Sequence, residues 1–359
     1  MENIINVPVL PFYYDKFIIM EKCKSIIVVF IAMIIAGSSN AQDPAFSQFF
    51  SSPLNINPAL TANINADWRA ISNFRDQWIG PSSPYVTGTI SYDSKIFQHK
   101  IPNVETDENA WGLGGMLMFD RAMGGIVKSS YASLDLSYRI KLNDGPTKHK
   151  IGVGFGATYG KRNVDFSALY FEEQFTGYGF NTNLPTGETA LSDMKPYFSG
   201  SAGLTYSITS EKSNFDIGAA AFHVNKPKQT FLEDENQTLA MRKVVHANFE
   251  TFLNDRVVLN ANAIYQTQIR AKYYSAGAAL GYYLPTQQDI LLMGGLWYWS
   301  DNAVIPYVGL AYKEFQFGVS YDITTSKLNN TTLKHSTWEL AIIIRGIRKP
   351  SAIIPCPWK

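Results

Sequence analysis

The side chains that could do chemistry in this 359-residue chain form no recognisable catalytic or metal-binding pattern. None of the five histidines has the HExxH or related spacing of a zinc site. They are His99, His149, His223, His246 and His335. No nucleophile elbow accompanies His246, so its nearby serines do not predict a hydrolase triad. Two cysteines, Cys23 and Cys356, provide neither a disulfide framework nor a Cys-rich metal site. We therefore predict no enzyme activity and no cofactor or metal.

Three glycines alternate along one strand-like stretch, at Gly152, Gly154 and Gly156, with Gly160 following. A phosphate-binding loop would need a helix directly after the glycines, and no helix signal follows them. The alternation instead predicts small residues on a crowded inner wall of a sheet.

The composition favours β structure in a membrane. Charged residues make up 17% of the chain, against roughly 25% in soluble domains, whereas aromatic residues make up 14%. The 31 basic and 30 acidic side chains give a formal net charge of +1, which excludes a nucleic-acid binder driven by bulk charge.

Apolar and polar residues alternate with a period of two throughout the chain beyond residue 41. In the stretch 131–140, Leu134 and Leu136 fall on one face and Ser133 and Asp135 on the other. The pattern returns at 198–206, 257–265 (with Asn260 and Asn262 on the polar face) and 338–342. No stretch there approaches the about 18 apolar residues of a spanning helix. Repeated strands of this kind predict an all-β transmembrane outer-membrane barrel, because a soluble β-sandwich would expose the apolar rows to water.

Turn residues divide the chain into about fourteen antiparallel strands, an even number as single-chain bacterial barrels have. The expected strands are 67–74, 85–93, 110–119, 128–140, 148–161, 197–209, 213–223, 243–252, 256–266, 272–283, 289–300, 303–312, 315–322 and 336–345. With both chain ends in the periplasm, the two longest connections, 162–196 and 224–242, face outward. Apart from 94–109, the connections on the other side are tight hairpins.

Charged side chains on the polar strand faces are expected in a wet lumen, because charge facing lipid costs about 2–4 kcal/mol at the membrane midplane. The expected lumen charges are Asp135, Arg139, Glu250 and Glu339. They form either a network of paired charges or a surface that binds a permeant or a plug. Aromatic clusters such as Trp297-Tyr298-Trp299 are expected at the membrane interface.

The N-terminus carries the pattern of a secretory signal peptide. Lys22 and Lys24 precede an apolar run over 26–36, and small residues end at Ala41. We expect translation to begin at Met20, so that residues 1–19 are a misassigned extension, 20–41 the signal peptide and Gln42 the mature N-terminus.

Several separated motifs, taken in order, resemble the PorP/SprF membrane proteins of the type IX secretion system, over essentially the whole mature chain. The motifs are 42–50 (QDPAFSQFF), 53–60 (PLNINPAL), 73–78 (NFRDQW), 91–93 (SYD), 215–218 (FDIG), 222–227 (FHVNKP), 305–309 (IPYVG) and 318–324 (GVSYDIT).

The resemblance implies an outer-membrane barrel of bacteria of the Bacteroidota type that works in protein export and, in some relatives, gliding motility. It implies an adaptor that links secreted cargo or surface adhesins to periplasmic ring components and peptidoglycan-associated lipoproteins. A general diffusion porin is the alternative function, and a soluble carbohydrate-binding β protein is a third. No nucleic acid is expected as a partner.

Two segments flank the expected barrel of residues 67–345. Prolines rule out a long helix or a regular strand in 42–66, which either plugs the lumen or lies under the periplasmic mouth. The basic, proline-rich tail 346–359 either docks periplasmic machinery or is a solvated extension. The expected partner-docking residues are Phe46, Phe49, Arg348, Lys349, Ile353, Ile354 and Trp358.

Overall fold

The computed structural model describes residues 43–79, 84–97, 110–187, 194–229, 238–285, 289–325 and 336–346. The predicted extension, the signal peptide and its cleavage site lie outside these residues. So do the tail residues Arg348, Lys349, Ile353, Ile354 and Trp358, together with most of the 94–109 connection.

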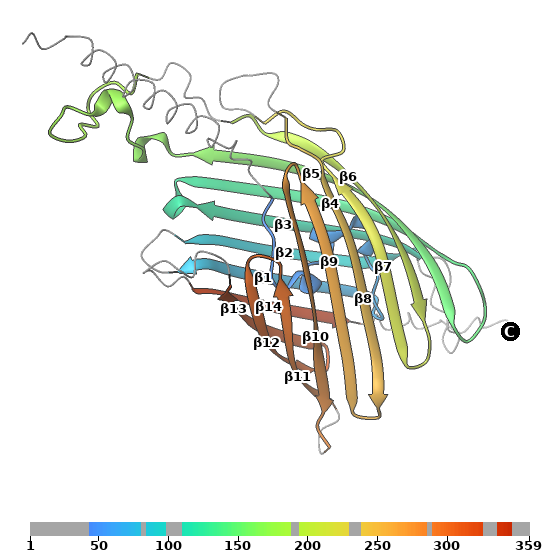
Figure 1. Cartoon of the computed structure of the whole chain (residues 1–359). Helices are drawn as coiled ribbons and strands as arrows, with labels where there is room; N and C mark the ends of the chain where they lie inside the picture. The colour runs from blue at the N-terminus through green and yellow to red at the C-terminus, as the bar shows by residue number, and fades with distance from the viewer. Residues whose placement is uncertain are drawn as a thin grey trace, which may run out of the picture. The chain divides into compact units, whose positions relative to one another are not determined.

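The described chain forms a closed barrel of fourteen antiparallel strands, which confirms the predicted fold class (Figure 1). Each strand pairs with its neighbours in sequence, and β1 pairs with β14 to close the barrel. The strands are β1 (Trp68–Ile79), β2 (Tyr85–Ile96), β3 (Ala110–Ala122), β4 (Val127–Lys141), β5 (Lys148–Val164), β6 (Tyr197–Thr209), β7 (Ser213–Phe222), β8 (Arg242–Asn254), β9 (Val257–Gln268), β10 (Ala271–Tyr283), β11 (Ile290–Trp299), β12 (Ala303–Tyr312), β13 (Phe315–Thr324) and β14 (Ser336–Gly346).

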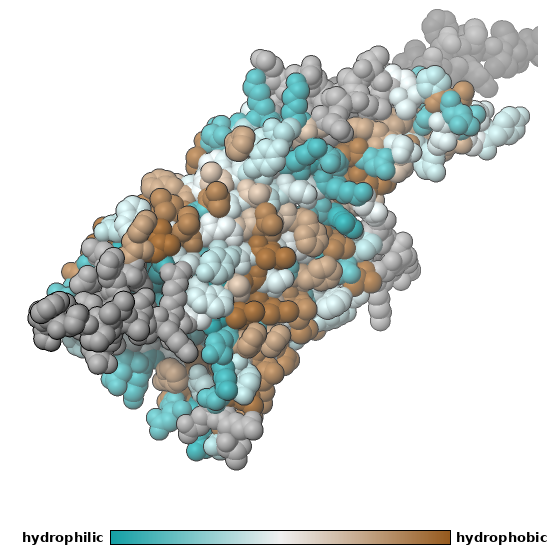
Figure 2. Space-filling view, turned by 180° about the vertical axis from the view of Figure 1, so that it is seen from behind, coloured by the Kyte–Doolittle hydropathy of each residue, from teal (hydrophilic) through white to brown (hydrophobic). Residues whose placement is uncertain are grey.

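The period-two pattern places polar residues inside and apolar residues outside over much of the wall. In β4, Ser133, Asp135 and Ser137 are buried, whereas Leu134 is 68% exposed on the outer surface. Figure 2 shows apolar side chains gathered over the outer wall. Because a β-barrel satisfies its backbone hydrogen bonds between strands, this apolar outer wall suits a lipid environment. Within the described residues, no helix is both long enough and apolar enough to cross a bilayer.

The inner wall of β8 to β12 differs from the polar lumen that the sequence predicts. Val258 and Ile264 of β9 face inward together with Asn262, and all three are buried. Trp297 and Trp299 are likewise buried inside, at 2% and 8% exposure, and only Tyr298 of that cluster faces outward, which corrects the expected interface position. The reason is that part of the inner wall packs against other protein atoms rather than against water.

The two ends of the barrel have connections of different length. The end where β1 begins and β14 ends, here called the turn end, carries the short connections at 142–147, 210–212, 255–256, 284–289 and 313–314. The opposite end, here called the long-loop end, carries the connections 165–196 and 223–241. Because successive strands run in opposite directions, connections after even-numbered strands lie at the turn end and those after odd-numbered strands at the long-loop end.

Candidate functional site

Residues Asp43–Asp67, here called the plug segment, run through the lumen from one end of the barrel to the other. At the long-loop end, the Asp43 amide donates to Gln268 Oε1 at 3.0 Å, on the last residue of β9. At the turn end, the Asp67 amide donates to the Gly346 carbonyl at 2.9 Å, on the last residue of β14. Asp43 and Gly346 therefore lie at opposite ends of the barrel, which does not agree with the expectation that both chain ends are on the periplasmic side.

Prolines divide the plug segment into three short helical turns. They are η1 (Phe49–Ser51), α2 (Pro53–Ile56) and η2 (Pro58–Leu60). Pro53 and Pro58 each occupy a first helical position, where a missing N–H costs nothing. Asn57 caps η2 by accepting from the Ala59 amide at 2.8 Å. The segment is thus a compact, folded filling of the lumen rather than an extended strand.

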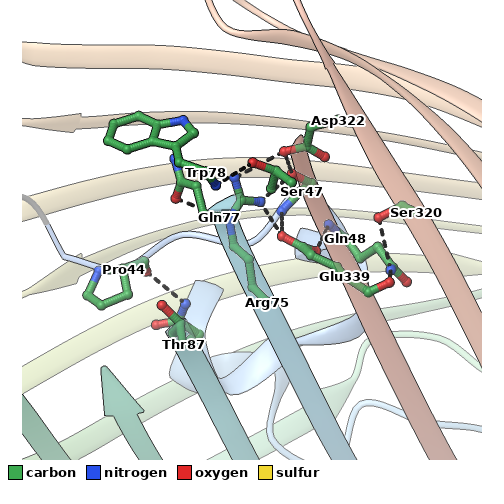
Figure 3. Close-up of polar contacts among 12 residues, drawn as sticks. Pro44, Ser47, Gln48, Arg75, Gln77, Trp78, Thr87, Ser320, Asp322 and Glu339 are labelled. Atoms are coloured by element: carbon green, nitrogen blue, oxygen red, sulfur yellow. Dashed lines mark hydrogen bonds and ion pairs between the residues drawn. The ribbon is translucent and has the colours of Figure 1, made fainter. Parts of the chain in front are cut away.

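The Arg75 cluster, which comprises Arg75, Asp322, Glu339, Ser47 and Gln48, fixes the first part of the plug segment to β1, β13 and β14 (Figure 3). Arg75 pairs with Glu339 and, at 3.0 Å, with Asp322. The Glu339 carboxylate also accepts from the amides of Ser47 at 2.6 Å and Gln48 at 2.8 Å. The cluster is almost fully buried, with the Arg75 side chain 2% exposed. Buried charges tolerate removal from water only when paired in this way.

A second group of charges holds the last part of the plug segment near the turn end. Asp93 pairs with Arg69 at 2.7 Å and accepts from the Ala62 amide at 2.6 Å. Arg139 donates to the carbonyls of Ala62 and Thr61 at 3.1 and 3.3 Å. These contacts satisfy plug carbonyls and amides that have no partner within a helix or sheet.

Glycines on the inner face of β5 and β6, among them Gly154 and Gly203, allow the η2 turn to approach the wall closely. A Cβ at Gly154 would overlap the backbone of Pro58 and Ala59, and one at Gly203 would overlap the Asn57 side chain. Because only glycine leaves this space, the alternating glycines of β5 are inner-wall residues against a crowded neighbour, as predicted.

The Gly154→Ala substitution is expected to lower the free energy of unfolding by about 1–3 kcal/mol, because the added methyl group overpacks against the plug backbone. The measurement is the denaturant midpoint of the detergent-solubilised barrel. Gly294→Ala is the matched control, since a Cβ there meets nothing within 4 Å. An equal, small effect of both substitutions would contradict the close approach.

Apolar side chains of the plug segment pack on the other side of the lumen. Phe50 stacks on Trp297 with ring centroids 4.7 Å apart and meets Tyr307 edge-on at 5.6 Å. Phe49 and Ile56 belong to the same buried cluster as Val244, Ile264 and Ile305 of the wall. This contact explains why the inner face of β8 to β12 is apolar.

Asp43, the first residue of the plug segment, lies in a charged site. Its carboxylate lies 2.8 Å from His223 Nε2 and 3.2 Å from the Arg242 guanidinium. Burial alone would raise the pKa of Asp43, but Arg242 and His223 outweigh it and lower the pKa to about 2. Because this pKa is below the ordinary 3.8, the contribution of the site to stability is complete above pH 3.8 and is lost as the pH falls through about 2.

The residues predicted from the sequence fall at different places in this arrangement. Asp135, Arg139 and Glu339 are buried and face inward, whereas Glu250 is exposed near the turn end. Phe46 and Phe49, predicted as partner-docking residues, are 4% and 5% exposed inside the barrel, so no partner reaches them while the plug segment is seated.

Sequence reasoning missed four residues that fix the plug segment. They are Asp43, Arg75, Asp93 and Asp322. Each lies in one of the motifs that carry the family resemblance, at 42–50, 73–78, 91–93 and 318–324. That coincidence is the signal that could have identified them. The described residues contain no group of three or more His, Cys, Asp or Glu side chains placed to hold a metal ion.

The closed fourteen-strand barrel with an apolar outer wall is that of an outer-membrane β-barrel protein. The chain belongs to the family of type IX secretion system membrane proteins PorP/SprF, whose model matches residues 38–343. A comparison with curated proteins found no match.

Among the solved structures similar to the chain are two channels and a transporter. The TodX deltaS2S3 mutant monoaromatic hydrocarbon channel is 10% identical, with a TM-score of 0.49, over 83% of this chain and 94% of that one. The CymD monoaromatic hydrocarbon channel is 10% identical, with a TM-score of 0.47, over 84% and 94%. The P. putida toluene transporter TodX is 12% identical, with a TM-score of 0.45, over 82% and 93%. These likenesses concern the fold.

Proposed function

We propose that this protein is an outer-membrane adaptor of the type IX secretion system, which links secreted cargo or surface adhesins to the periplasmic machinery and supports gliding motility where the cell glides. Family membership supports a place in this system. The finer role rests on the filled lumen, since a barrel that is packed with its own chain is suited to holding other proteins rather than to passing solutes.

The packing of the plug segment on several parts of the wall supports an adaptor over a diffusion porin. Ser47 contacts β13 and β14, Asn57 contacts β6, β7 and β8, and Phe50 contacts β11 and β12. Asn57, Ala59 and Thr61 have no exposed surface at all. A porin instead needs an aqueous path with a constriction.

Deletion of Ser351–Lys359 is expected to abolish export and the co-purification of periplasmic components, while leaving a heat-modifiable barrel in the outer membrane. The tail carries Arg348, Lys349 and Lys359 and a proline-stiffened stretch with Trp358, which suits a peptide bound in a groove. Export and pull-down mass spectrometry from native membranes are the measurements. Normal export at normal barrel levels would place the docking surface elsewhere on the protein.

The long-loop end is expected to face the cell exterior, because long loops are extracellular and short turns periplasmic in outer-membrane barrels. Cysteines introduced at Thr182 and Glu235 should therefore react with a membrane-impermeant reagent on whole cells. A cysteine at Asp144, in the 142–147 turn, should react only after the outer membrane is permeabilised. The reverse labelling pattern would show that the barrel is inserted the other way.

A further inference from the structure

A cavity of about 1320 Å³ occupies the turn end of the barrel, here called the vestibule. Phe49, Phe50 and Ile56 of the plug segment form its floor, and the turn residues Glu211, Asp289 and Glu314 lie at its rim. Pockets for small molecules usually measure about 300–1,000 Å³. The size of the vestibule therefore favours a segment of polypeptide over a small ligand.

One side of the vestibule carries a concentration of positive charge. Among the described residues, eight basic and five acidic side chains line the cavity. Basic side chains face it from five strands, β14, β1, β2, β4 and β5: Arg345, Arg69, Lys95, Lys141, Lys148 and Lys150. The acidic side chains lie elsewhere, on β7 and β8 (Asp216 and Glu250) and at the rim.

Two like-charged pairs lie directly across neighbouring strands in this basic arc. Lys141 is the register partner of Lys150, and Arg69 is the register partner of Arg345. Like charges directly opposite each other destabilise a sheet. These charges have local partners: Arg69 pairs with Asp93 at 2.7 Å, Lys141 pairs with Asp144 at 2.7 Å, and Arg345 donates to Gln316 at 2.9 Å. Because basic side chains outnumber acidic ones in the lining and gather on one side of it, the cavity is suited to an anionic ligand.

The opposite side of the vestibule carries an apolar patch, beside the polar residues Asn260 and Asn262 of β9. Val258 of β9, Leu291 and Met293 of β11 and Trp297 line it, and they continue the apolar inner face against which Phe50 packs. A ligand that fills the vestibule would therefore meet cations on one side and hydrocarbon on the other. This combination selects an amphipathic anion.

We propose that the vestibule binds an acidic, amphipathic polypeptide segment of a periplasmic partner, with its carboxylates against the basic arc and its apolar side chains against Val258 and β11. The inference rests on the proposed adaptor function, because it requires the turn end to face the periplasm. The protein's own tail does not fit this chemistry, since residues 347–359 carry three basic and no acidic side chains.

The test is binding of a short fluorescent peptide of alternating Glu and Leu to the full-length protein in detergent, measured by anisotropy at low and high salt. Binding should weaken at high salt, because salt screens the attraction between the basic arc, which faces an open cavity, and the peptide carboxylates. The Lys141→Gln/Lys150→Gln double variant should bind about tenfold more weakly. The Lys128→Gln/Lys161→Gln variant, altered on the same two strands at the long-loop end, should bind like the parent protein.

Several outcomes would overturn the inference. A Lys and Leu peptide that binds equally well, or binding unaffected by Lys141→Gln/Lys150→Gln, would show that the arc selects no anion. Binding of laurate, together with failure of the peptide, would assign the vestibule to a small amphiphile. Loss of vestibule binding alone leaves the proposed function intact, because deletion of Ser351–Lys359 tests that function through export. Heat-modifiable mobility confirms that each variant is folded.

Discussion

The Arg75→Leu variant is expected to lose about 3–5 kcal/mol of stability. It leaves the carboxylates of Asp322 and Glu339 buried side by side without their shared cation. The Glu339→Gln substitution should cost less, because Arg75 keeps Asp322 as a partner and the amide oxygen can still accept from one of the two plug amides, Ser47 or Gln48. The denaturant midpoint of the solubilised barrel is the measurement.

The matched control for the Arg75 cluster is Glu250→Gln, which removes a lumen charge that is exposed near the turn end. Its effect should stay within about 0.5 kcal/mol, as for other solvated surface sites. If Arg75→Leu were as harmless as Glu250→Gln, the buried cluster would not be what secures the plug segment to the wall.

Removal of residues 43–62 is expected to convert a barrel that barely conducts into one with steady open-channel current in planar bilayers. The deleted residues include those that contact β6, β7, β11, β12, β13 and β14 across the lumen. Without them the wall encloses water, and ions pass. Single-channel recording of the purified protein is the measurement, with the Ser351–Lys359 deletion as a control that leaves the plug segment in place.

Current through the intact protein equal to that of the deletion variant would contradict the role of the segment as a plug. That result would favour the diffusion porin over the adaptor. A deletion variant that fails to form a heat-modifiable barrel would show instead that the plug segment is required for folding, because its buried side chains supply the apolar inner core. In that case the single-channel current is measured on the Phe49→Ala/Phe50→Ala double variant, which keeps the plug segment but removes these two rings.

The sequence by itself determined the barrel and nearly all of its strand positions. Successive side chains of a strand point to opposite faces of the sheet. A pattern such as Leu134-Asp135-Leu136 therefore shows, from neighbouring residues alone, that one face is apolar and the other polar. The expected strands 197–209 and 303–312 match β6 and β12 residue for residue, because turn residues bound them. The sequence also predicted that the glycines of β5 lie on a crowded inner wall, because their spacing has the same period of two as the strand.

Only the tertiary structure decided the content of the lumen and the direction of the plug segment. Arg75 and Glu339 are 264 residues apart in sequence, and Asp43 and Gln268 are 225 apart, so no local pattern links them. Arg75 and Glu339 meet because they are register partners where β1 closes on β14, and Asp43 meets Gln268 because the plug segment reaches the end of β9 inside the barrel. Alternation states that Trp297 and Tyr298 face opposite sides, but not which side is inside. That choice follows from Phe50, which packs on Trp297 once the plug segment has entered the barrel.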